Sequence, residues 1–344
     1  MDKLEQLIKH LQDIIFKASE FDLKDLPIQF YQNDDKGLIL KTGFPNQWFR
    51  EITRQHALDN QIDWQTHINA HLTQLPGYGI RNIKNAIAIA SGKGGVGKST
   101  VSTNLACATA NLGANVGLLD ADIYGPSIPT MMGISDQPAC TEDNRYIPLN
   151  NHAVHCMSMG FLQSEGPFIW RGPMLAKALM EMINQTAWPE LDYLFIDLPP
   201  GTGDIPLSLT QKIPLSGAVI VTTPQTIATL DAEKAIQMFI KLNIPIIGII
   251  SNMAWHECKN CHHHSYIFGD TGTKQLANKY QIPVLGELPL DDSIRQHGDE
   301  GQPVAIDASS ELSVIWKKIA LKMTALLSKQ PINRTSKLPP VRAE

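Results

Sequence analysis

The clearest pattern in the chain is a series of short apolar runs, each of which ends at a polar or glycine-rich turn. Such runs lie at 86–90, 116–119, 194–196, 218–221, 246–250 and 284–289. Segments with helical spacing of apolar residues separate many of them, at 98–112, 173–184, 230–242 and 311–327. This alternation predicts an α/β fold, with a mostly parallel, doubly wound sheet covered on both faces. The stretch from about 123 to 170 is expected to be a long loop region.

The first part of the chain has a different pattern. Residues 2–17 carry apolar side chains at i, i+3 and i+4, which predicts an amphipathic helix, and a second helical stretch lies near 48–56. A short apolar run lies at 38–40, and a Pro-Gly break at 76–79 marks the end of this part of the chain. We therefore expect a small α+β helper domain at 1–80, a nucleotide-binding domain at 81–329, and a proline-containing flexible tail at 330–344.

Composition excludes several classes of protein. Of the 344 residues, 43% are hydrophobic and 18% are charged, which is ordinary for a soluble globular protein. A net charge of −5 without a long basic run argues against nucleic-acid binding, and no apolar stretch is long enough for a transmembrane helix. The charged N-terminus does not resemble a signal peptide. Five cysteines are too few and too scattered for a disulfide framework, so a cytoplasmic protein is expected.

The turn after the run at 86–90 carries the strongest chemical signal. It matches G-x-x-x-x-G-K-[ST], the phosphate-binding P-loop, over Gly92, Lys93, Gly94, Gly95, Val96, Gly97, Lys98, Ser99 and Thr100. The glycines allow backbone N–H groups to turn toward phosphate oxygens, and the following helix N-terminus adds a positive dipole. Lys98 adds a full charge, and the Ser99 hydroxyl can bind Mg²⁺. The sequence predicts a nucleoside triphosphate site.

Carboxylates at the ends of other predicted strands extend this site. Asp197 ends a buried strand, as a Mg²⁺-supporting carboxylate does in P-loop proteins. Asp120 and Asp122 follow another strand and, on a continuing extended chain, would share one side facing the phosphates. One could fix a metal-bound water and the other could orient the attacking water. Ligands bind at the carboxyl ends of parallel strands, so these groups and Asn252 are expected along one edge.

A Cys-x-x-Cys pair, Cys258 and Cys261, follows the strand at 246–252. Two subunits that each gave both thiolates could bind a [4Fe–4S] cluster. A zinc site, with Cys₄ across a dimer or with histidines such as His256 and His262–His264, is a second interpretation. A redox dithiol is the third. Cys107 is expected to be a buried, inert thiol, while Cys140 and Cys156 have no assigned role.

Several motifs together resemble one family. They are Ser91-Gly-Lys-Gly-Gly-Val-Gly-Lys-Ser-Thr100, Leu118-Leu-Asp-Ala-Asp-Ile-Tyr-Gly-Pro-Ser127, Trp170-Arg-Gly-Pro-Met174, Asp197-Leu-Pro-Pro-Gly-Thr-Gly-Asp204 and the cysteine pair. Over about 85–305 the chain resembles the Mrp/ApbC iron–sulfur cluster carrier ATPases, within the deviant Walker-A group that includes MinD and ParA. Relatives usually have glycine soon after the second cysteine, whereas this chain has three histidines. Residues 1–80 match weakly and contain no cysteine.

The resemblance implies specific roles. Lys93 would reach the nucleotide of a partner subunit, Asp122 would belong to the first switch and orient the attacking water, and Asp197–Asp204 would form the second switch. Asn252 would lie near the adenine. The implied protein is a homodimeric, slow, Mg²⁺-dependent ATPase that binds ATP and a [4Fe–4S] cluster and serves apo iron–sulfur proteins and cluster-assembly factors.

Two other functions compete with the cluster carrier. One is a MinD/ParA-like positioning ATPase, which needs a basic amphipathic C-terminal helix to bind membrane or a basic face to bind DNA. The tail, with Pro339 and Pro340, cannot form that helix. The other is a zinc or nickel metallochaperone that uses the cysteine and histidine insertion.

Overall fold

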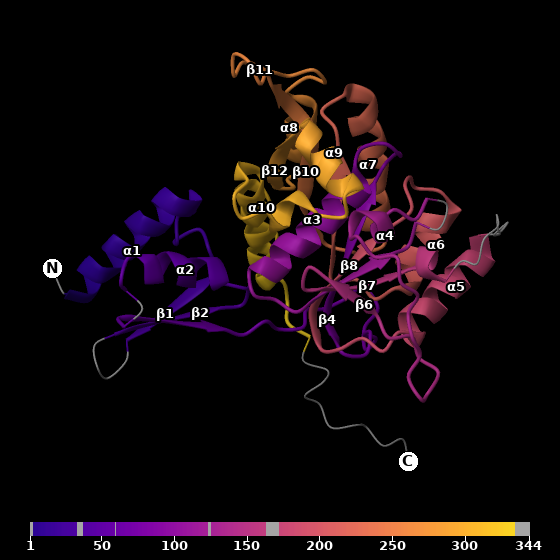
Figure 1. Ribbon diagram of the computed structural model, residues 1–344, viewed down its shortest axis with the longest axis horizontal. Coiled ribbons are helices and arrows are strands. Elements are labelled where there is room, and N and C mark those ends of the chain that lie inside the picture. Colours follow the sequence, from indigo (N-terminus) through magenta and orange to yellow (C-terminus); the bar gives the residue numbers. More distant parts are fainter. Residues whose placement is uncertain (1–2, 33–36, 59, 123–124, 163–171, 334–344) are drawn as a thin grey trace.

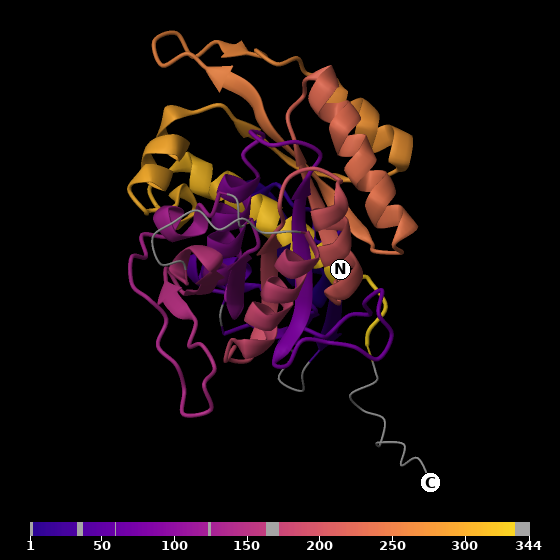
Figure 2. The same cartoon turned by 90° about the vertical axis from the view of Figure 1, so that its right-hand side faces the viewer.

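The computed structural model describes residues 3–32, 37–58, 60–122, 125–162 and 172–333. A small N-terminal domain lies beside a large α/β domain (Figure 1). The large domain confirms the predicted class, because its central sheet is mostly parallel and carries helices on both faces (Figure 2). None of the helices in the described residues has the length and apolar character needed to span a bilayer.

The central sheet has nine strands in the order β11-β10-β9-β4-β8-β5-β7-β6, with β12 also paired to β10. In chain order they are β4 (Ile83–Ser91), β5 (Val116–Asp120), β6 (Leu149–Asn151), β7 (Val154–Ser158), β8 (Leu191–Asp197), β9 (Gly217–Thr222), β10 (Ile246–Glu257), β11 (His264–Ser265) and β12 (Val284–Pro289). Apart from the hairpin partners β6 and β11, these strands pair in parallel. The parallel strands at the centre are buried on both faces, which explains their continuous apolar runs.

Helices cover this sheet on both faces. They are α3 (Lys98–Asn111), α4 (Ile128–Met131), α5 (Gly172–Gln185), α6 (Asp204–Lys212), α7 (Thr226–Lys241), α8 (Gly272–Tyr280), α9 (Asp292–Asp299) and α10 (Glu311–Ser328), with 3₁₀ turns η1 (Met159–Phe161) and η2 (Val304–Ile306). One core cluster includes residues of α3 and α10, and a second includes residues of α5 and α7. Both clusters contain side chains of β4, because strand side chains alternate between the two faces.

The predicted loop region at 123–170 was wrong in part. Within it, β6 and β7 form an antiparallel hairpin, and α4 begins at Ile128. The two residues of the hairpin turn, His152 and Ala153, both have positive φ (50° and 59°). Turns of this kind normally use Asn-Gly or Asp-Gly, so the sequence lacked the usual signal. Residues 163–171, including Trp170 and Arg171 of a resemblance motif, lie outside the described residues.

The N-terminal domain consists of α1 (Lys3–Ser19), β1 (Ile28–Gln32), β2 (Leu38–Thr42), α2 (Gln47–Gln55) and β3 (Ile62–Thr66). Its three strands have the order β1-β2-β3, with β1 antiparallel and β3 parallel to β2. The helices α1 and α2 lie together over one face of this sheet (Figure 1). Leu38, Leu40 and Trp64 are buried beneath them and belong to the same core cluster as α3 and α10. The two domains therefore share a continuous core.

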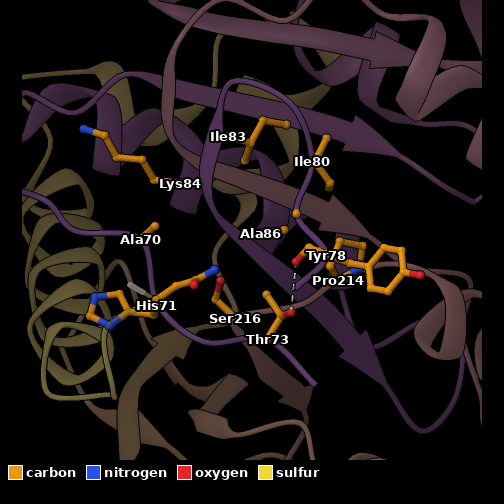
Figure 3. Close-up of a pocket in the computed structure, with 12 residues that line it drawn as sticks. Ala70, His71, Thr73, Tyr78, Ile80, Ile83, Lys84, Ala86, Pro214 and Ser216 are labelled. Atoms are coloured by element: carbon orange, nitrogen blue, oxygen red, sulfur yellow. Dashed lines mark hydrogen bonds between the residues drawn. The ribbon is translucent and has the colours of Figure 1, made fainter. Parts of the chain in front are cut away.

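The segment between the domains is hydrogen-bonded to residues 331–333, so the first part of the predicted flexible tail at 330–344 is held in place. Leu72 N–H donates to the Pro331 carbonyl and Asn333 N–H to the Ala70 carbonyl, so residues 331–333 are held against 70–72. The remainder of the predicted tail, 334–344, is outside the described residues. This segment also covers a cavity of about 60 Å³ (Figure 3). The buried Ser216 hydroxyl lines this cavity and has no hydrogen-bond partner among the described residues.

Candidate functional site

The P-loop joins β4 to α3 at the carboxyl edge of the sheet. Gly95 and Gly97 have φ values of 78° and 81°, in the left-handed region that favours glycine, and Gly97 is the N-cap of α3. Gly92 is required for a different reason. A Cβ at this position would lie 2.0 Å from the Asp231 carbonyl carbon of α7, so the loop and α7 can approach only if residue 92 is glycine. The sequence-predicted turn thus has the backbone of a phosphate cradle.

Asp197 is the centre of a buried polar cluster at the start of α3. Its carboxylate is fully buried and lies 2.8 Å from Lys98 Nζ. The Ser99 hydroxyl donates to Oδ2 at 2.6 Å, and the Ser102 hydroxyl donates to Oδ1 at 2.5 Å. The structure thus brings together Asp197, Lys98 and Ser99, three of the residues singled out in the sequence. Ser102, one helical turn beyond Ser99, was missed, although i, i+3 spacing puts it on the same side of α3.

The donor set fits a magnesium ion. Mg²⁺ prefers hard oxygen ligands and usually binds through one or two protein groups together with phosphate oxygens and waters. The Ser99 hydroxyl and an Asp197 carboxylate oxygen are already side by side at the mouth of the P-loop.

Asp120, the last residue of β5, and Asp122, which follows it, have different surroundings. The strand ends at Asp120, so the continuing extended chain expected to place both on one side is not formed. Asp120 accepts from the N–H groups of Asp122 and Ile128 and from the Ser158 hydroxyl. Burial and the nearby Asp197 carboxylate raise its pKa to about 7. Asp122 Oδ2 lies 3.8 Å from Lys98 Nζ, so Asp122 adjoins the phosphate-binding lysine while Asp120 holds the loop.

The segment after β8 lies against the P-loop. Leu198 N–H donates to the Ile89 carbonyl, and Gly201, with a φ of 91°, donates from its N–H to the Ser91 carbonyl. Both hydrogen bonds go to the end of β4, the strand that leads into the P-loop. Lys93 is half-buried and forms no ion pair with any residue that the structure describes.

A pocket of about 200 Å³ adjoins the helix end of the P-loop. Gly97, Thr100 and Asn252 line one side, and Asn252 donates its side-chain N–H to the Val96 carbonyl at 2.8 Å. The other side comes from the end of β12 and from α9, with Leu290 and Ile294 as apolar walls. A pocket beside a phosphate cradle, with apolar walls and with polar side chains such as Asn252 and Arg295, suits a nucleoside base. The residues from α9 were not anticipated.

The cysteine pair lies at the tip of the β10–β11 hairpin, which projects from the sheet at the top of Figure 1. Cys258 is half-buried and Cys261 is exposed, and both are free thiols. The Cys258 sulfur accepts hydrogen bonds from the N–H groups of Asn260 and Cys261 and from the Cys261 thiol, which lower the pKa of Cys258. The turn therefore favours the thiolate form of Cys258, which is the form of cysteine that can bind a metal ion.

The neighbouring histidines contact a carboxylate instead of the thiols. His262 Nδ1 is 2.6 Å and His264 Nε2 3.3 Å from Glu257, and His264 also stacks on Trp255 with 4.6 Å between ring centroids. No group of three or more metal-ligating side chains occurs within the described residues. The chain thus carries two free thiols at this turn. Of the other cysteines, Cys107 and Cys156 are buried, and burial raises the pKa of Cys107 to about 12, which agrees with an inert thiol.

The lowered pKa of Cys258 gives a testable prediction. In the metal-free, reduced protein, iodoacetamide should modify Cys258 with a half-maximal rate at lower pH than it does in the urea-unfolded chain. The thiolate is the reacting species, and the folded turn favours it through hydrogen bonds. Mass spectrometry of the modified peptide after short pulses at a series of pH values measures both profiles. Identical midpoints in the folded and unfolded chain would contradict the hydrogen-bonded turn.

Comparison with known proteins agrees with this geometry. Residues 82–324 match the family model described as ParA, NUBPL iron-transfer P-loop NTPase. An iron–sulfur cluster carrier protein from Escherichia coli strain K12 is 49% identical over 308 residues, covering 85% of this chain and 84% of that protein. The iron–sulfur cluster transfer protein NUBPL of Mus musculus is 46% identical over 256 residues, covering 73% and 80%.

Solved structures give the same fold. A nucleotide-binding protein from Archaeoglobus fulgidus, in complex with ADP, has a TM-score of 0.57 and 40% identity, over 65% of this chain and 88% of that one. The cell division ATPase MinD of Pyrococcus furiosus has a TM-score of 0.55 and 21% identity, over 70% and 99%, which shows a common fold.

Proposed function

This chain belongs to the family of NUBPL-type iron-transfer P-loop NTPases, and on that premise we propose that it is an ATP-driven iron–sulfur cluster carrier. Its cargo is a [4Fe–4S] cluster, held by Cys258 and Cys261 from each of two subunits and passed to apo iron–sulfur proteins. The observation that carries this proposal is the course of β10. Asn252, at the nucleotide pocket, and Cys258, just beyond the strand end, are six positions apart on one continuous segment.

The dimer follows from ligand number. A [4Fe–4S] cluster takes four thiolates, and each hairpin supplies two. Lys93 supports the same arrangement, because it lies on the P-loop and has no carboxylate partner among the described residues. In a dimer with P-loops facing each other it would reach the partner's nucleotide.

Nucleotide binding must rearrange the polar side chains that surround Asp197. Lys98 is paired with this carboxylate at 2.8 Å, and incoming phosphates would draw Lys98 away from it. Ser99 and Asp197 would hold Mg²⁺, which neutralises charge on the phosphates during transfer. Ser102 keeps the carboxylate in place, and Asp122, which adjoins Lys98, would orient the attacking water. The 198–204 segment would then transmit loss of the terminal phosphate through its bonds to β4.

Iron stoichiometry tests the proposal. Anaerobic reconstitution with iron and sulfide should yield a dimer with about two iron and two sulfide per chain, because one four-iron cluster is shared. Incubation of the loaded dimer with an apo-ferredoxin should then convert the apo-ferredoxin to its holo form, and MgATP should make this transfer faster. Four iron per chain, a loaded monomer, or protein that contains zinc in place of iron after anaerobic purification would contradict the shared cluster.

A further inference from the structure

One residue in the wall of the nucleotide pocket is hydrogen-bonded through both of its backbone groups to the base of the cysteine hairpin. Leu290, which follows β12, lines the pocket of about 200 Å³ beside the P-loop. Its N–H donates to the Trp255 carbonyl at 2.7 Å, and its carbonyl accepts from His256 Nδ1 at 3.0 Å. Both partners lie in the last part of β10, which leads to Cys258. The pocket wall therefore cannot shift unless the end of β10 shifts with it or these bonds break.

The strand that joins the pocket to the hairpin is irregular at the pocket. The pairing of β10 with β12 changes register between Ser251 and Trp255, as at a β-bulge. Within this stretch Met253 has a φ of 53°, in the left-handed region that is strained for a residue with a side chain. Met253 also lines the nucleotide pocket. The strand thus bends at a point that a bound nucleotide would touch.

Charged groups interact across the same boundary. Asp291 follows Leu290 and lines the pocket. Burial raises the pKa of Asp291, but hydrogen bonds from Ser293 and the nearby Lys259 and His256 outweigh it and hold that pKa below its ordinary value. Lys259 lies between the two cysteines in the sequence. The carboxylate at the edge of the pocket is therefore close enough to interact with the cysteine turn.

We propose that the base of a bound nucleotide orders the cysteine turn through Leu290 and His256. The inference rests on the proposed function in taking this pocket to hold the base. A base between Asn252 and Leu290 would restrict the pocket wall, and the two backbone bonds of Leu290 would restrict the end of β10 with it. His256 is a positioning residue, because it acts on Cys258 through the backbone of the strand that carries both.

This route differs from the one through the 198–204 segment. That segment adjoins the P-loop and would respond to the terminal phosphate, whereas Leu290 lies where the base would sit. A ligand shifts a conformational equilibrium only through contacts that differ between the two states. ADP, which carries the base, would therefore order the hairpin, and a chain of phosphates without a base would not.

Hydrogen exchange of the full-length, reduced, metal-free chain tests this route. MgADP should slow amide exchange at least threefold in the peptide covering 255–264, and it should also slow exchange of the P-loop at 92–100. Magnesium tripolyphosphate has the phosphates without the base, so it should slow exchange at the P-loop alone. The Cys258 N–H donates to the His263 carbonyl and the His262 N–H to the Cys258 carbonyl, so these amides report the turn directly.

Variants of His256 separate the proposed route from nucleotide binding itself. His256→Ala removes the bond to Leu290 and should abolish the effect of MgADP on 255–264, while protection of the P-loop remains. His256→Asn places an amide N–H near the position of Nδ1 and should restore at least half of the effect. The matched control is His71→Ala. His71 Nδ1 is also 3.0 Å from a carbonyl, that of Gln330, but this pair does not line the nucleotide pocket, so the response to MgADP should be unchanged.

Equal slowing of 255–264 by MgADP and by magnesium tripolyphosphate would overturn the inference, since phosphates would then suffice. Full slowing in His256→Ala, loss of the response in His71→Ala, or unchanged exchange of 255–264 in a chain whose P-loop is protected would overturn it as well. Absence of protection at the P-loop would refute the nucleotide site, and the inference with it. Because no cluster is present, a wrong iron stoichiometry would leave the hydrogen-exchange result intact.

Discussion

Replacement of Cys258 and Cys261 together by serine is expected to abolish cluster uptake, with iron content falling from about two per chain to a background value. Serine keeps the size of the side chain but removes the thiolate that iron prefers. Since the cysteine turn is at an exposed hairpin tip, its loss should leave the fold and ATP turnover unchanged. Iron and sulfide analysis after anaerobic reconstitution, with the visible absorption spectrum, measures the effect.

The chain provides its own control for that experiment. Cys140 is also an exposed free thiol, but it lies far from the hairpin in sequence, so Cys140→Ser should load fully. Full uptake by the double variant would show that other residues hold the cluster. Loss of uptake in Cys140→Ser would point to general thiol chemistry rather than to a built site.

Lys98→Ala is expected to lower ATP hydrolysis by roughly 10²–10³-fold or more, because Lys98 is the charge closest to the phosphate cradle. The substitution also leaves Asp197 without its cation in a buried position, which costs about 3–5 kcal/mol in typical cases. A steady-state phosphate-release assay, with thermal unfolding of the same samples, separates the two effects. Cluster uptake by the cysteine turn should persist in a folded Lys98→Ala protein.

Lys84 offers a matched comparison. It pairs with Asp192 at 2.7 Å, near the amino ends of β4 and β8, away from the P-loop. Removing this pair by Lys84→Ala should leave hydrolysis close to that of the unmodified chain. A Lys98→Ala protein that hydrolyses ATP at the unmodified rate would refute the nucleotide site. A similar loss of hydrolysis in Lys84→Ala would show that the loss in Lys98→Ala comes from a less stable fold.

The sequence was most informative where function resides in contiguous residues. The P-loop could be predicted because its glycines, lysine and serine follow each other between a strand and a helix, and the structure has that turn. Ser102 was missed because its role depends on β8 lying beside the first turn of α3. The pocket walls from α9 were missed for a similar reason. That helix has few apolar residues, and its Asp291 cap and the ion pairs of Arg295 stabilise it instead.

Asp120 and Asp122 show a different limit of prediction from the sequence. Spacing alone could not distinguish Asp120 from Asp122, because the outcome depends on where β5 ends. Once the chain turns after Asp120, its carboxylate is used by the N–H groups of the turn and by Ser158, a residue of a strand that the apolar pattern did not reveal. Similarly, the histidine run looked like a possible ligand set, yet Glu257, on the same hairpin, engages two of the three rings.

The shared core of the two domains has a consequence for delivery. Gln47 N–H bonds to the Leu112 carbonyl, Lys318 pairs with Glu20 at 2.8 Å, and the apolar cluster runs through both domains without a break. The N-terminal sheet is thus not carried on a swinging linker. The spacing between this domain and the cysteine hairpin is therefore set by the fold and not by a linker. A client protein that contacted both would have to match that spacing, so the architecture itself would select among clients by dimension.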